Sequence, residues 1–155
     1  MKIDVSAELD GFWSDNGESF VLGEDVHNHQ ELIDASKPIL FMIIDQINDG
    51  VRISDVGCVM ETEAKIRGFK VIKNLTGHGI ESSLHEAPLG IANFRDRFNL
   101  TRFYKDSVVA IETFISTRSN YAQTLKIAGQ WQVIKVVLWH SMNILALSLM
   151  ENRLC

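Results

Sequence analysis

The sequence predicts one α+β domain whose strands are mainly antiparallel. Residues 3–8 alternate between apolar and polar side chains, which is the two-residue period of a strand, and Asp10-Gly11 follows as a hairpin signal. Two later segments, about 25–47 and 54–68, repeat apolar residues at helical spacing instead. With 155 residues, 46% of them apolar, the chain is long enough for one domain with a real core.

Composition and charge exclude several classes of function. The formal net charge is −5, so we expect no nucleic-acid partner. The two cysteines, Cys58 and Cys155, form no framework of paired spacings, which is typical of a reducing, cytoplasmic setting. Met1 leads directly into a strand-like segment, so we expect no signal peptide. No apolar run is long enough to span a bilayer, so we expect no membrane partner.

The first two predicted strands each carry an aspartate. Asp4 lies in the first strand, and Asp15 lies in a second strand that runs from Phe12 to about Leu22. Because the two strands pair antiparallel, a modest register places both carboxylates on one face. The alternative is that both are ordinary polar residues of a half-exposed sheet, because strand alternation produces such pairs freely.

Two helices follow the hairpin. The first contains Pro38, so we predict a kink or a break just before that residue. The second is predicted to start near Ser54, as an N-cap, and to end at Gly68. His27 and His29 stand at the start of the first helix. Their spacing does not put them on one helical face, so we predict that both lie at the surface.

The stretch around His78 is the strongest candidate for a functional site. It follows a short predicted strand at 69–72, and it holds the imidazole between Gly77 and Gly79, seven residues before His85. The glycines predict a sharp bend that lets the ring reach an ion or a substrate, although a single histidine between glycines usually marks only a turn. One imidazole with several carboxylates is the ligand set of manganese, iron or cobalt, and not of a thiolate-bound structural zinc.

Glu112 is the unusual member of a buried-strand pattern at 107–114. A carboxylate inside an apolar run is costly to bury without a partner, so the pattern implies one. A metal ion and a structural salt bridge both satisfy that requirement, and the residues alone leave both open.

Five separated motifs occur along the chain in this order: Ile3-Asp4-Val5, Ser14-Asp15-Asn16-Gly17, Gly77-His78-Gly79-Ile80, Leu84-His85-Glu86-Ala87-Pro88 and the run from Val109 to Thr117. Together they resemble the motifs of the type I methionine aminopeptidases of peptidase family M24. The resemblance covers about residues 2–125. It implies an incomplete pita-bread fold, an antiparallel sheet with helices on one face, in which 1–125 form the C-terminal half of the catalytic domain.

The resemblance also implies roles for individual residues. Asp4, Asp15, His78 and Glu112 would be metal ligands, with Asp15 bridging two divalent ions (manganese, iron, cobalt or zinc), and His85 would contact the substrate and stabilise transition-state charge. The implied reaction removes the N-terminal methionine of peptides and nascent chains in the cytoplasm. A monomer is expected, and the ribosome is among the implied partners. The alternatives are a non-catalytic pita-bread binding module and a protein that resembles an Xaa-Pro aminopeptidase.

The chain departs from the family pattern beside the candidate site and at its start. Glu81 replaces a glycine, and Ala87 replaces the second glutamate of a Glu-Glu-Pro motif. We expect the extra carboxylate to disturb the entry of substrate. Met1 falls inside the first ligand strand, so we also expect the family's N-terminal half to be missing, together with its other substrate-contacting histidine.

The family's last metal ligand is a glutamate in an Ala-Gln-His-Glu-His-Thr strand, and this sequence does not contain it. A reading frame in which each codon starts at the last base of the present codon can encode that motif across 139–144. The same shifted frame over 132–136 permits Gly-Asn-Lys-Gly-Gly, which also belongs to the family's sequence. We therefore predict that 126–155 is an out-of-frame tail; a core strand plus helix at 133–150 is the alternative. Without the bridging glutamate we expect at most one weakly held ion and little or no activity.

Overall fold

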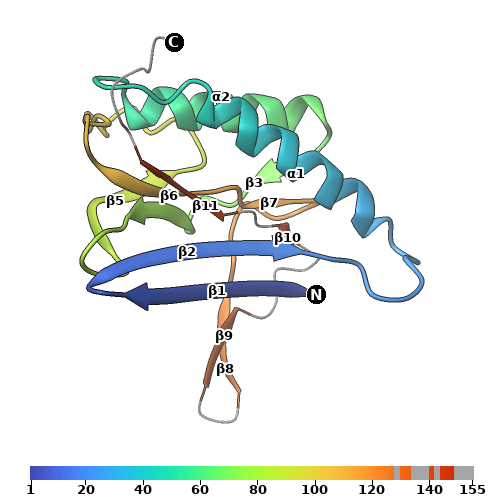
Figure 1. Cartoon of the computed structure of the whole chain (residues 1–155). Helices are drawn as coiled ribbons and strands as arrows, with labels where there is room; N and C mark the ends of the chain where they lie inside the picture. Colours follow the sequence, from blue (N-terminus) through green and yellow to red (C-terminus); the bar gives the residue numbers. More distant parts are fainter. Residues whose placement is uncertain (128–129, 134–139, 142–143, 149–155) are drawn as a thin grey trace, which may run out of the picture.

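A computed structural model describes residues 1–127, 130–133, 140–141 and 144–148, with side chains described as far as residue 123. Figure 1 shows the arrangement. No helix in the described ranges is both long and apolar enough to cross a membrane. The elements in chain order are β1 (Lys2–Leu9), β2 (Phe12–Ser19), α1 (His29–Ile44), α2 (Ile53–Ile66), β3 (Lys70–Val71), β4 (Thr76–Gly79), β5 (Glu86–Ala92), β6 (Val108–Glu112), β7 (Ile115–Ser116), β8 (Thr124–Ile127), β9 (Gln130–Val133), β10 (His140–Ser141) and β11 (Ile144–Ser148).

The core of the fold is an antiparallel sheet of six strands in the order β1-β2-β11-β6-β4-β5. Two small sheets, β10-β7-β3 and β8-β9, accompany it. Both helices cover one face of the large sheet (Figure 1), where Val109 and Ile111 of β6 join the main hydrophobic core. The predicted class, antiparallel strands with helices on one face, is therefore confirmed.

The first hairpin forms as the alternation predicts. Asp10 and Gly11 both have positive φ, 52° and 86°, as a tight turn between antiparallel strands requires. The register pairs Ser6 with Asp15 and Asp4 with Gly17, so the two aspartates share one face. β2 ends at Ser19, earlier than expected.

Three predictions about the helices are wrong. Helix α1 runs unbroken through Pro38, because apolar residues on both sides of the proline stay buried against the sheet only if the helix continues. That burial offsets a proline cost of about 3 kcal/mol. His29 is buried rather than at the surface, because it begins α1 beside Asp25, whose carboxylate accepts its N–H at 2.8 Å. Helix α2 is capped at Arg52, so Ser54 lies inside its first turn.

Candidate metal site

Three side chains from three separate strands meet on the face of the sheet opposite the helices. Asp15 comes from β2, His78 from β4 and Glu112 from β6, and each is less than 8% exposed. The Nε2 atom of His78 lies 3.4 Å from Oε1 of Glu112 and 3.6 Å from Oδ2 of Asp15. The buried partner that the sequence implies for Glu112 is therefore an imidazole, with a second carboxylate beside it.

The glycines that flank His78 coincide with an irregularity in the strand. Neither Gly77 nor Gly79 has positive φ, but the pairing of β4 with β5 shifts register on both sides of His78, as at a β-bulge. A Cβ on Gly77 would lie 2.4 Å from the backbone oxygen of Ala110, and one on Gly79 would lie 2.2 Å from that of Ala87. The glycines let β4 pack tightly between β5 and β6, and this close approach brings His78 to Glu112.

The orientation of the His78 ring is set by its own backbone. Nδ1 lies 2.9 Å from the carbonyl oxygen of Gly79. Because a carbonyl oxygen can only accept, Nδ1 is the atom that carries the proton in this bond. In the neutral ring, Nε2 then has a free lone pair that points toward the two carboxylates. A histidine held in this way is prepared to be a metal ligand through Nε2.

The electrostatics of the site favour a cation. Burial, and next the negative charge of Asp15, raise the pKa of Glu112 to about 8; Lys2 opposes this shift and Asp4 adds to it. Ser6 donates a hydrogen bond to Oδ1 of Asp15 at 3.1 Å and so holds that carboxylate in place. A divalent ion would offset both the burial and the repulsion from Asp15 that together keep Glu112 protonated.

Asp4 and His85 lie at the open side of the same site. Both line a cavity of about 420 Å³ together with His78 and Glu112. Asp4 is exposed and forms an ion pair with Lys2 at 3.0 Å. The rings of His78 and His85 are 4.2 Å apart between centroids. The structure thus groups Asp15, His78 and Glu112 tightly and leaves Asp4 and His85 at the rim.

The donor atoms fit a divalent ion, although the ligand set is not fully assembled. Among the described residues, no group of three or more His, Cys, Asp or Glu side chains is already arranged to hold a metal ion. Two ligand atoms that are each about 2.1 Å from one ion lie about 3.0–3.6 Å apart at ordinary bond angles. The two contacts of His78, at 3.4 and 3.6 Å, have this separation. Oxygen and imidazole donors also match manganese, iron or cobalt.

One residue that supports the site has no clear signal in the sequence. Asn93 is fully buried, and its amide donates to the carbonyl of Leu75 at 3.0 Å and accepts from the N–H of Phe114 at 3.2 Å. It therefore joins the start of β4 to the end of β6, the two strands that carry His78 and Glu112. Its place directly after the last residue of β5 is the clue that the sequence offers.

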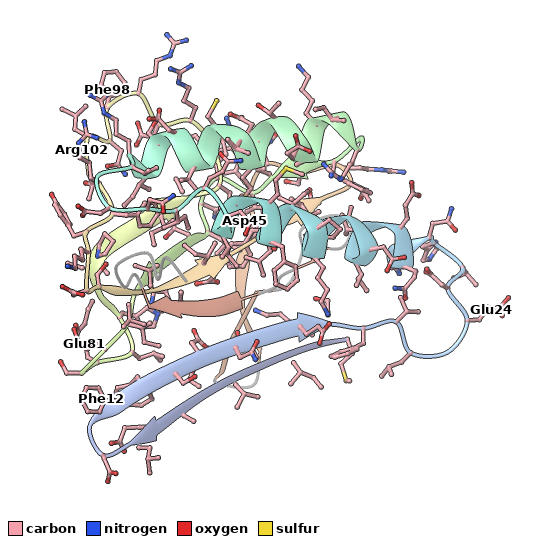
Figure 2. All side chains as sticks on the ribbon, turned by 45° about the horizontal axis from the view of Figure 1, so that its top comes forward. Phe12, Glu24, Asp45, Glu81, Phe98 and Arg102 are labelled. Carbon is pink, nitrogen blue, oxygen red and sulfur yellow. The ribbon has the colours of Figure 1, made fainter. Side chains whose placement is uncertain are left out.

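Glu81, one of the departures from the family motif, lies outside the cavity. Glu81 is exposed and is not among the residues that line the cavity, and its carbonyl accepts the N–H of Trp13 at 2.8 Å. Figure 2 labels Glu81 near Phe12, at the turn end of the first hairpin. The shifted-frame glutamate falls at Met142 and Asn143, which lie outside the described residues.

Comparison with known proteins identifies relatives that are longer than this chain. Methionine aminopeptidase 2 of Bacillus subtilis is 42% identical over 135 residues, which is 87% of this chain and 53% of that protein. The methionine aminopeptidase of Archaeoglobus fulgidus is 36% identical over 114 residues, covering 74% of this chain and 38% of that protein. The chain thus spans about half the length of the relatives it matches, or less.

Solved structures share the fold. A methionine aminopeptidase from Thermotoga maritima superposes with a TM-score of 0.85 at 25% identity, covering 97% of this chain and 60% of that one. A prolidase from Pyrococcus furiosus gives a TM-score of 0.72 at 18% identity, which shows a common fold only. The model of metallopeptidase family M24 matches residues 1–137. This chain is a member of metallopeptidase family M24, with an incomplete pita-bread fold.

Proposed function

We propose that this chain carries the metal-binding part of an aminopeptidase that removes N-terminal methionine from peptides and nascent chains in the cytoplasm. The observation that carries the proposal is the position of His78 Nε2, which lies 3.4 Å from Glu112 and 3.6 Å from Asp15. Relatives at 36–42% identity that are named methionine aminopeptidases support this choice of substrate.

Each residue has a distinct role in the proposal. Asp15, His78 and Glu112 hold a divalent ion, with Asp4 as a further ligand from the rim of the cavity. A divalent ion in this position supplies Lewis acidity and activates water for hydrolysis. His85 is exposed at the mouth of the cavity, where it can donate a hydrogen bond to the substrate amide and stabilise charge as it develops.

We also propose that the chain as written has little or no activity, because its last carboxylate ligand is missing. Residues 126–155 are proposed to be an out-of-frame tail. In the backbone register, Ile144 of β11 pairs with Gly17 of β2 and with Glu112 of β6. A glutamate on a strand in this place would stand between the strands of Asp15 and Glu112. Its loss leaves at most one weakly held ion, since changes to outer-shell residues alone cost roughly 10–100-fold in affinity.

The test compares two proteins in one assay. The first is the chain as written, and the second carries the shifted-frame sequence after residue 125. Each is given a Met-Ala-Ser peptide with added manganese or cobalt. The proposal expects little or no methionine release from the first protein and more from the second. If neither protein hydrolyses the peptide but both retain it, the chain is a binding module instead. If resequencing of the gene yields no glutamate motif in the shifted frame, the tail proposal fails.

A further inference from the structure

Lys2 places a positive charge in the wall of the candidate metal site. It lines the cavity of about 420 Å³ together with Asp4, His78 and Glu112. Its Nζ atom lies 3.0 Å from Oδ2 of Asp4. A divalent ion that enters this cavity therefore meets an ammonium group already bound to one of the carboxylates that it needs.

The geometry of strand β1 brings this lysine to the site. Lys2 and Asp4 both lie in the part of β1 that pairs with β2, so the ladder fixes which way their side chains point. Residues two apart in a strand share one face of the sheet. Ser6, two residues further along, donates to Oδ1 of Asp15 at 3.1 Å, which identifies this face as the one that carries the metal site.

The ion pair between Lys2 and Asp4 is exposed enough to open. The two side chains are 33% and 45% exposed, whereas Asp15 and Glu112 are buried. An ion pair at this exposure contributes a factor of about five or less to an equilibrium. The four-carbon stem of lysine is flexible, so it can turn the ammonium group into water. Asp4 is thus a carboxylate whose availability depends on a partner that can move.

The charge of Lys2 also acts on the buried part of the site. Burial, and next the charge of Asp15, raise the pKa of Glu112, and Lys2 opposes that shift. The ammonium group therefore stabilises negative charge in the metal-free site, as a divalent ion would do more strongly. Two cations that share the carboxylate of Asp4 would repel each other. The lysine and the ion consequently disfavour each other at this position.

We propose that Lys2 competes with the divalent ion for Asp4. The ammonium group holds this carboxylate while the site is free of metal, and it must release the carboxylate before Asp4 can become a ligand. The inference rests on the proposed metal site, and it adds a positioning residue that lowers the affinity of the site for metal. The three buried side chains bind the ion first, and Asp4 joins last.

The first test is a manganese titration of the full chain, with free Mn²⁺ measured by electron paramagnetic resonance. Lys2→Met keeps an unbranched side chain but removes the charge, and should lower the manganese Kd by about three- to tenfold, because both the competition and the repulsion are lost. Lys2→Arg keeps the charge and the ion pair, so its Kd should stay within about twofold of the parent.

Lys37→Met is the matched control for the change in net charge. Lys37 forms an exposed ion pair with Glu18 at 3.1 Å, with side chains that are 58% and 43% exposed, and it does not line the metal cavity. Its removal changes the net charge by the same amount and should leave the manganese Kd unchanged. Circular dichroism confirms that each variant is folded.

The second test repeats Lys2→Met in an Asp4→Asn background, which completes a double-mutant cycle. The ammonium group then has no carboxylate to hold and can turn into water, so the removal of Lys2 should change the Kd by less than about twofold. This result separates competition for Asp4 from a general effect of the charge.

The outcomes distinguish this inference from the metal site on which it rests. Tighter binding by Lys2→Met that depends on Asp4 supports the competition. Binding no tighter than the parent, an equal gain from Lys37→Met, or the full gain in the Asp4→Asn background overturns the competition and leaves the metal site in place. If neither the parent nor Lys2→Met binds manganese, the proposed metal site fails, and this inference fails with it.

Discussion

The substitution Glu112→Gln should stabilise the metal-free protein at alkaline pH. Burial and the neighbouring Asp15 raise the pKa of Glu112 from 4.5 to about 8. In the unfolded chain this carboxyl loses its proton near pH 4.5, whereas in the folded chain it keeps the proton until about pH 8. Stability is therefore lost as the pH rises through this window, at about 1.4 kcal/mol per pH unit. The pKa difference corresponds to a total loss of about 5 kcal/mol above pH 8.

Urea unfolding at several pH values between 4.5 and 9, in the presence of a chelator, measures this effect. Glutamine has nearly the same shape and no charge, so the variant should lack the slope and be more stable than the parent at pH 8.5. Glu24→Gln is the matched control, because Glu24 is exposed on the loop before α1 (Figure 2) and its removal should leave the slope unchanged. A Glu112→Gln protein that is less stable than the parent at pH 8.5 would refute the reasoning. So would a slope that persists in the variant.

Two further substitutions test the packing that positions the site. Gly79→Ala puts a Cβ 2.2 Å from the backbone oxygen of Ala87, so it should cost about 1–3 kcal/mol or more of stability, measured as a lower urea midpoint. Asn93→Ala leaves the carbonyl of Leu75 and the N–H of Phe114 without their buried partner, and should cost about 2–4 kcal/mol in the same measurement. An Asn93→Ala protein as stable as an exposed-site variant such as Asn48→Ala would contradict the role given to this amide.

Local patterns predicted much of the fold. The alternation and the Asp-Gly turn predicted the first hairpin and placed Asp4 and Asp15 on one face, because side-chain direction in a strand depends only on residue parity. The apolar run around Glu112 predicted a buried carboxylate that needs a partner, and the structure supplies His78 as that partner. These predictions succeeded because each follows from a short-range rule.

The predictions that failed depend on contacts between distant segments. The proline cost in α1 is local, but the burial that outweighs it involves the whole sheet face. Gly77 and Gly79 are needed because β5 and β6 press against β4, which no feature of their own neighbourhood reveals. Asn93 acts by joining two strands far from it in sequence.

The central claim is that Asp15, His78 and Glu112 together bind a divalent cation. Isothermal titration of the chain with manganese at pH 7.5 tests it most directly, with His78→Ala as the comparison and a tail-corrected chain as the reference. The account predicts a single weak site that His78→Ala abolishes, with proton release as Glu112 ionises. No binding at all, or binding that survives His78→Ala unchanged, would contradict the claim, and two tight sites in the chain as written would contradict the missing-ligand proposal.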